Sequence, residues 1–311
     1  MVTVKEIASY KDYGRVVSIS NGTVEALVTV DLGPRVIFFG KVGGQNFMND
    51  NRPCFGTLTD EKFEEYFGKG TFFENLGGHR TWISPESYPE TYNPDNYPVQ
   101  YEILTDGAVF TPRPETANGV LKTLTVTAAG EGAEIKVRMD VKNVSDKDKE
   151  FAIWGLSVSA TGGTAIIPMN TNDTGLLSNR IISVWPYTDL SDDRIFYGKR
   201  FITLRQDVTA TTPVKLGFDL NGGKVHYLLN NEVFTKSYET LHPTAKYPDG
   251  GCSFETYNCG DFIELESLGE LKTVKPGETS TLTETWTIKD KPCEVDLRND
   301  DSVGAFCEML K

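Results

Sequence analysis

The chain has 311 residues, and 31 lysines and arginines against 44 aspartates and glutamates give it a formal net charge of −13. This acidity argues against nucleic acids and anionic membranes as partners, because both are bound through basic patches that attract phosphate. A hydrophobic content of 39% with 11% aromatic residues is enough for a packed core and excludes disorder of the whole chain.

No apolar run approaches the roughly 20 residues that cross a bilayer, so we expect no membrane association. The N-terminal segment, residues 1–6, lacks the basic and apolar regions of a secretion signal, which predicts a cytoplasmic protein. The cysteines form no Cys-x-x-Cys pair and are scattered: Cys54, Cys252, Cys259, Cys293 and Cys307. We therefore expect reduced thiols rather than a disulfide framework or a zinc site.

Apolar and polar residues alternate along most of the chain, which predicts half-buried antiparallel strands. The first two form a hairpin of residues 23–30 and 36–39 around the turn 32–35. Further strands are expected at residues 99–104, 121–127, 134–141, 151–159, 200–204, 214–220, 224–229, 262–267 and 280–288. Many short strands separated by Gly, Asn, Asp and Pro are typical of a β-sandwich or barrel.

Helical periodicity is confined to two short segments. Residues 59–67 begin with Thr59 as a candidate N-cap, and residues 300–310 carry apolar side chains at helical spacing, so the second helix should pack outside a sheet. The segment 84–98, rich in proline and tyrosine, predicts an ordered loop over the surface and belongs to the candidate site. No clear linker divides the chain, which predicts one all-β domain over residues 1–311.

The segment 77–86 is the first candidate for chemistry. It brings together His79, Arg80 and Trp82, that is, an acid/base group, a fixed cation and a flat aromatic ring. Sugars are bound by aromatic faces and by side chains that hydrogen-bond hydroxyl groups, so this mixture favours a carbohydrate pocket. The alternative is a tight turn with a buried tryptophan.

The chain has only three histidines, which limits any histidine-based mechanism. His226 lies in a predicted strand, where a structural role is expected. His242 lies in the loop-like segment 241–251, whose polar and aromatic side chains could reach a pocket, so functional and structural interpretations of it stay open.

Three glutamates form the second candidate. Glu264 and Glu266 are two residues apart in a predicted strand and share one sheet face, and Glu255 comes from the preceding strand. Mutual repulsion and burial would raise the pKa of at least one of them toward the range useful for acid/base catalysis. The alternatives are an exposed, salt-bridged sheet face, or a hard cation held by carboxylate oxygens.

Residues 247–257, 262–269 and 275–278, together with residues 77–80 and with 142–155, resemble the galactose mutarotase-like superfamily, and in particular bacterial members related to aldose 1-epimerases. The resemblance covers about residues 21–288. It implies a large antiparallel β-sandwich, a supersandwich, and a small-molecule carbohydrate as partner. It implies no cofactor and no metal, and no particular oligomeric state is expected.

Aldose 1-epimerases use a glutamate as base and a histidine as acid to open and reclose the sugar ring. The resemblance places Glu266 in the base position, because Leu265-Glu266-Ser267 is similar to the motif of the epimerase strand, with Glu264 beside it. It makes His79 a substrate-binding histidine. Arg80 and Trp82 would then hold sugar hydroxyls and the ring face.

The sequence departs from the family where epimerases carry their acid histidine, because residues 151–156 contain Trp154 and no histidine. Either His79, the favoured candidate, or His242 serves as the acid. Otherwise the protein binds sugar without epimerising it, with Trp154 and Trp82 as stacking surfaces and the carboxylates, Glu255 included, accepting hydroxyl groups. Cleavage of an acidic polysaccharide ranks last, because the arginines are scattered in the sequence.

Overall fold

The structure, a computed structural model, describes residues 1–220, 222–241 and 244–311. Its main body is two large sheets packed face to face, in which neighbouring strands are antiparallel. The first sheet runs in the order β1 (Thr3–Ile7), β2 (Val16–Ser20), β3 (Val24–Thr29), β4 (Val36–Lys41), β7 (Gly78–Ser84), β12 (Lys149–Ser159), β21 (Ile263–Leu268), β20 (Phe254–Asn258), β17 (Val214–Phe218) and β14 (Ile182–Val184), with β22 (Lys272–Val274) paired to β12.

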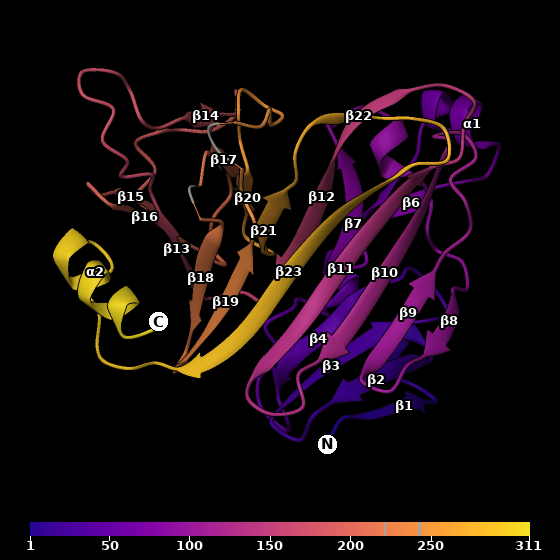
Figure 1. Cartoon of the computed structure of the whole chain (residues 1–311), viewed down its shortest axis with the longest axis horizontal. Coiled ribbons are helices and arrows are strands. Elements are labelled where there is room, and N and C mark those ends of the chain that lie inside the picture. The colour runs from indigo at the N-terminus through magenta and orange to yellow at the C-terminus, as the bar shows by residue number, and fades with distance from the viewer. Residues whose placement is uncertain (221, 242–243) are drawn as a thin grey trace.

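The second sheet runs in the order β15 (Ile195–Tyr197), β16 (Phe201–Arg205), β13 (Thr164–Pro168), β18 (Lys224–Leu229), β19 (Glu232–Tyr238), β23 (Thr279–Asp290), β11 (Glu134–Asn143), β10 (Val120–Ala128), β9 (Gly107–Thr111) and β8 (Gln100–Ile103). A small separate sheet pairs β5 (Thr57–Leu58) with β6 (Phe73–Glu74). The helices are α1 (Glu61–Phe67), α2 (Asp300–Glu308) and the 3-10 turns η1 (Lys11–Tyr13), η2 (Arg52–Cys54) and η3 (Glu90–Tyr92). In Figure 1, β10 and β11 cross in front of β3 and β4.

The main core lies between the two sheets, where alternate residues of each strand point inward. Trp286 of β23 is fully buried at its centre, with its ring centroid 5.3 Å from those of Phe39 and Phe234. Burying one such side chain contributes about 1.5–3 kcal/mol, and offset or edge contacts between rings add to this. The predicted all-β sandwich is therefore confirmed, because the alternation seen in the sequence does build two facing sheets.

The segment 78–84, predicted as part of a turn or site loop, is instead strand β7 in the middle of the first sheet. Two glycines at its start, Gly77 just before the strand and Gly78 as its first residue, hid the strand. Gly77 and Gly78 have φ values of +70° and +62°, and an added Cβ would lie 2.2 Å from the carbonyl oxygen of Asn49 and 2.6 Å from that of Val36. They are required by the close entry of the chain into β7, and are not a sign of flexibility.

Both predicted helices form. The N-cap of α1 is Asp60 rather than Thr59, since the Asp60 carboxylate accepts a hydrogen bond of 2.8 Å from the backbone N–H of Phe63. Helix α2 packs Val303 and Phe306 against the outer face of the second sheet, as expected, and lies beside β16 and β13 in Figure 1. Among the described residues, no helix is both long enough and apolar enough to cross a membrane.

Candidate functional site

Five neighbouring strands of the first sheet, β7, β12, β21, β20 and β17, present polar residues on the face turned away from the second sheet. The strand registers align one residue from each strand in a row: Arg80, Leu156, Glu266, Glu255 and Gly217. Glu264 lies one step further along β21 on the same face. The structure therefore brings Arg80 and the three predicted glutamates together.

Gly217 keeps space open at the end of this row. A Cβ at Gly217 would lie 2.6 Å from the sulfur of Cys252 and 3.3 Å from Cγ of Glu255. A larger residue would therefore displace the Glu255 side chain. The geometry of this carboxylate depends on the absence of a side chain on the neighbouring strand.

Above this face lies a cleft with two adjoining chambers. The inner chamber, about 280 Å³, is lined by charged and aromatic side chains that include Arg80, Lys215, Glu264, Trp82, Tyr187 and Tyr257. The outer chamber, about 550 Å³, is lined by Leu58, Glu86, Tyr88, Tyr92, Trp154, Trp185, Asp249 and Glu255. Glu86, Tyr92 and Trp154 line both chambers, so the two are continuous.

Lys215 is the electrostatic centre of the cleft. Its buried Nζ lies 3.0 Å from Oε2 of Glu255 and 3.3 Å from Oε2 of Glu266. The same atom lies 4.8 Å from the ring centroids of both Trp154 and Trp185. Burial alone would lower the pKa of Lys215, but the two carboxylates more than offset this and raise it, so the ammonium stays charged.

Lys215 also occupies the position between two carboxylates where a hard cation would sit. Among the residues that the structure describes, there is no group of three or more His, Cys, Asp and Glu side chains arranged to hold a metal ion. The cation alternative raised by the three glutamates therefore finds no ligand cluster in the described part of the chain.

Two carboxyl groups facing the cleft have strongly shifted pKa values. Burial, reinforced by the charge of Glu266, raises the pKa of Glu264 to about 7, although Arg80 acts in the opposite direction. Burial raises the pKa of Glu255 to about 9 against the attraction of Lys215. Arg80 Nη2 lies 3.6 Å from Oε1 of Glu264, and burial lowers the pKa of Arg80 to about 10. Such paired shifts are characteristic of acid/base sites.

Glu266 lies beneath the cleft and lines neither chamber. It is fully buried, and its Oε2 accepts a hydrogen bond of 2.9 Å from Nε1 of Trp154. Its Oε1 has no hydrogen-bond partner among the described residues. Glu266 thus holds Lys215 and Trp154 in place from below, while Glu264 and Glu255 face the cleft.

The structure does not bring together the predicted acid His79 and the predicted base Glu266. Because side chains alternate along β7, His79 points into the core while Arg80 points into the cleft. His79 is fully buried, its Nδ1 lies 2.9 Å from Oγ of Ser157, and its ring centroid is 4.9 Å from that of Trp286. Burial holds its pKa well below the ordinary value, so this histidine is neutral and structural.

The other two histidines do not replace it. His226 lies on β18 of the second sheet, 2.8 Å from the hydroxyl of Thr235, and burial lowers its pKa to about 4. Its structural role agrees with the sequence expectation. His242 lies outside the residues that the structure describes.

The two predicted stacking tryptophans differ in their surroundings. Trp82 lines the inner chamber, but Cζ of Arg80 lies 4.0 Å from its ring centroid and covers that face. Its ring also packs 5.2 Å from Tyr92 and 5.4 Å from Trp154. Trp82 is therefore a packed wall, whereas Trp154 lines both chambers.

Sequence reasoning missed Lys215 and Trp185, and it included Asp249 only as a member of the loop-like segment 241–251 that was expected to be able to reach a pocket. Lys215 carried a usable signal, because it is the one charged residue of the segment 214–218, which is otherwise apolar. Trp185 and Asp249 come from segments far apart in the sequence, and nothing local indicates that they meet. Glu86 and Tyr92 belong to the loop 84–98, which was expected to lie at the site.

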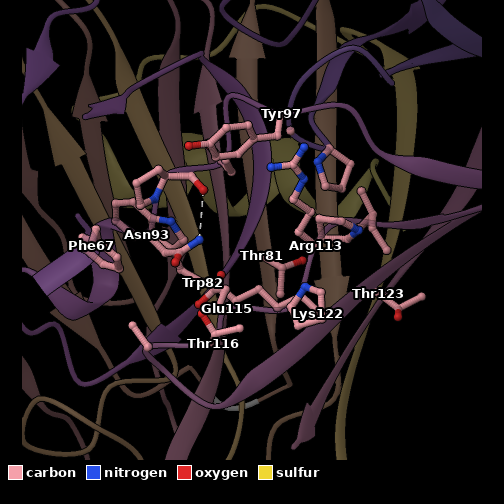
Figure 2. A pocket seen from close by; sticks show the side chains of 18 of the residues that line it. Phe67, Thr81, Trp82, Asn93, Tyr97, Arg113, Glu115, Thr116, Lys122 and Thr123 are labelled. Atoms are coloured by element: carbon pink, nitrogen blue, oxygen red, sulfur yellow. Dashed lines mark hydrogen bonds and ion pairs between the residues drawn. The ribbon is translucent and has the colours of Figure 1, made fainter. Parts of the chain in front are cut away.

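A further cavity of about 220 Å³ lies on the other side of Trp82, between the loop 93–97 and β10 (Figure 2). Its charged groups are largely paired with one another. Nζ of Lys122 lies 2.5 Å from Glu115, and Arg35 is ion-paired with Asp95. Since the shifted carboxyl groups lie in the cleft, we place the candidate site there.

The architecture defines a class, that of antiparallel supersandwich proteins with a polar cleft on one face of a sheet. Within that class the chain has the galactose mutarotase-like fold, as its sequence motifs imply. One similar structure is a galactose mutarotase-like protein from Lactobacillus casei, which is 12% identical, covers 88% of this chain and 100% of its own, and has a TM-score of 0.55. Another is a galactose mutarotase-like protein from Clostridium acetobutylicum, which is 12% identical, covers 93% of this chain and 99% of its own, and has a TM-score of 0.54.

A third similar structure is a protein from Klebsiella pneumoniae that is provisionally described as an aldose 1-epimerase (9% identity, 99% of this chain and 86% of that one, TM-score 0.57). No family model matches the sequence, and no curated protein is similar to it. At these identities the likeness establishes the fold, and the function has to be argued from the site.

Proposed function

We propose that the chain is a carbohydrate-active isomerase of the aldose 1-epimerase type, which interconverts the anomers of a sugar with two carboxyl groups. The observation that carries the proposal is that Glu264 and Glu255 face one continuous cleft with pKa values raised to about 7 and about 9. Two carboxyl groups whose pKa values differ and lie near neutrality can act as base and as acid at the same pH.

The lining of the cleft suits a sugar. Trp154 and Tyr257 offer apolar ring surface, and Arg80 and Lys215 offer hydrogen-bond donors for hydroxyl groups. Oε1 of Glu255 is buried without a hydrogen-bond partner among the described residues, so a ligand hydroxyl would satisfy it. Few convergent polar groups among aromatic side chains are typical of small-molecule sites.

In the proposed reaction Glu264, largely ionised above its pKa, removes the proton from the anomeric hydroxyl. The bond between the anomeric carbon and the ring oxygen breaks, and protonated Glu255 donates its proton to that oxygen. The product is the open-chain aldehyde, which rotates and closes by the reverse transfers. Glu266 is a positioning residue that holds Lys215 and Trp154 from beneath the cleft.

A second candidate function is noncatalytic sugar recognition. It is favoured by the absence of a histidine in the cleft among the described residues, since His79 faces the core and His226 lies in the other sheet. In that case the same aromatic and polar groups would bind the sugar, and the raised pKa values would reflect burial alone.

The two candidates differ in the rate of anomer exchange, which can be followed by polarimetry and by NMR exchange spectroscopy over a panel of aldoses. The isomerase predicts faster exchange with wild type and a loss of at least about 100-fold for Glu264→Gln and for Glu255→Gln. Glu131→Gln, which removes an exposed carboxylate in the turn between β10 and β11, is the matched control and should retain the wild-type rate. Binding of sugars without any acceleration would establish the recognition protein instead.

A further inference from the structure

The outer chamber differs chemically from the inner one. Its walls include four aromatic side chains, Tyr88, Tyr92, Trp154 and Trp185. Its charged lining is acidic only, since it consists of Glu86 and Asp249, and no lysine, arginine or histidine is among the described residues that line it. Glu255, which the proposed reaction keeps protonated near neutral pH, adds a polar but uncharged carboxyl group. The inner chamber, by contrast, is lined by both Arg80 and Lys215.

We propose that the outer chamber binds a protonated amine, and that the sugar accepted by the cleft is therefore an amine-bearing one. The inference rests on the proposed function and names its substrate class. The neutral part of the ring would lie in the inner chamber, and the ammonium group would lie among the aromatic rings and carboxylates of the outer chamber.

Aromatic rings and carboxylates together select ammonium groups for a physical reason. The face of an indole or phenol ring carries negative potential, so a cation within about 6 Å of its centroid is attracted, most strongly where water is excluded. Nearby carboxylates add charge-assisted hydrogen bonds. An anionic substituent would meet repulsion from the same groups.

The protein's own Lys215 shows that the two tryptophans of the outer chamber can accommodate an ammonium group. Nζ of Lys215 lies 4.8 Å from the centroids of both Trp154 and Trp185, and both indoles line the outer chamber. Lys215 itself lines only the inner chamber and is held by Glu255 and Glu266, so it does not fill the outer one.

One carboxyl group of the outer chamber, that of the protonated Glu255, retains an oxygen that can still accept a hydrogen bond. Glu255 is 1% exposed, and its Oε1 has no hydrogen-bond partner among the described residues, although Oε2 contacts Lys215. Glu86 and Asp249 are exposed residues on loops at the chamber. They can approach an incoming amine without first being desolvated, whereas Glu255 supplies the buried end of the site.

The test compares sugars that differ only at one substituent. Isothermal titration calorimetry at pH 7 would measure binding of glucose, glucosamine and N-acetylglucosamine, and of the corresponding galactose series. We expect each amino sugar to bind at least tenfold more tightly than both its hydroxyl and its N-acetyl counterpart, because only the amine carries a positive charge.

A pair of double variants separates local charge from overall charge. Glu86→Gln with Asp249→Asn removes two carboxylates of the outer chamber and should reduce the ratio of amino-sugar to neutral-sugar affinity at least threefold. Asp106→Asn with Glu131→Gln removes two exposed carboxylates in the turns β8–β9 and β10–β11 and should leave that ratio at the wild-type value. Circular dichroism and melting temperatures would verify that both variants fold.

The failures are distinguishable. If neutral and amino sugars bind equally well, or if both double variants change the ratio alike, the amine site is overturned. The proposed function then still stands, provided that wild type accelerates anomer exchange. If no sugar of either series binds and no anomer exchange is accelerated, the proposed function itself fails.

Discussion

At the scale of single residues, the two shifted carboxyl groups predict a bell-shaped dependence of anomer exchange on pH. Glu264 acts as base only when ionised, so kcat/KM should rise through about pH 7, and Glu255 acts as acid only when protonated, so it should fall through about pH 9. Stopped-flow polarimetry between pH 5 and 10 measures both limbs. A flat profile with full activity at pH 5 would contradict the assignment of Glu264.

The same residues predict a dependence of stability on pH. Since the pKa of Glu255 is raised from 4.5 to about 9, the folded chain keeps a proton that the unfolded chain releases. Stability from this group is fully present below the unfolded pKa and is lost as the pH rises toward 9, by up to about 1.4 kcal/mol per pH unit.

Urea unfolding between pH 7 and 9 measures this slope, to which the thiols of Cys54, Cys252 and Cys307 also contribute because burial raises their pKa values. The comparison with Glu255→Gln isolates the part that belongs to Glu255. We expect the free energy of unfolding of wild type to fall, and the fall to be smaller in Glu255→Gln. An equal slope in both proteins would mean that Glu255 is ionised in the folded chain.

At the scale of elements, a buried ion pair of the second sheet lies beneath the cleft, and its lysine joins the two sheets by hydrogen bonds. Lys236 of β19 and Glu284 of β23 are fully buried 3.2 Å apart, and Lys236 also donates hydrogen bonds to the carbonyl oxygens of Gly155 and Leu265 on β12 and β21. Breaking one side of such a pair leaves an uncompensated charge in the core.

Lys236→Met should therefore lower the free energy of unfolding by about 3–5 kcal/mol. Lys236→Met combined with Glu284→Gln should recover part of this loss, because the unpaired carboxylate is gone. Chemical denaturation of the two variants provides the measurement. A loss of under 1 kcal/mol in the single variant would show that the pair does not support the fold.

Element by element, the sequence predicted strands with alternating patterns well, and it also found the strands β12 and β21, which are buried on both faces. It failed at β7, which begins with a glycine. β10 alternates between buried and half-buried residues and was predicted within a residue of its bounds. β7 was missed because Gly77 and Gly78 resemble a turn. This omission mattered most for the site, because only in a strand do the neighbours Arg80 and His79 lie on opposite faces of the sheet.

The carboxylates were found from the spacing of Glu264 and Glu266 within one strand, which sets a common face regardless of tertiary structure. Their division of roles could not be predicted in this way. Whether Glu266 or Glu264 faces the cleft depends on Lys215 and Trp154, which come from other strands. Contacts between distant segments leave no local pattern in the sequence.

At the scale of the whole molecule, a net charge of −13 implies repulsion spread over the surface. Salt shortens the range of this repulsion to about 8 Å at 0.15 M and about 3 Å at 1 M. We expect the melting temperature to rise by a few degrees when sodium chloride is increased from 0.01 to 0.5 M. Differential scanning calorimetry checks this, and a decrease would show that attractive surface ion pairs dominate instead.

The row that runs from Arg80 through Leu156 and Glu266 to Glu255 also limits how this protein can evolve. One residue inserted into β12 would turn Trp154 toward the core and its neighbours toward the cleft, although composition would hardly change. Length variation is consequently excluded from the central strands. New specificities are accessible through changes in the loops that carry Glu86, Trp185 and Asp249. The central strands beneath the cleft can change only by substitution.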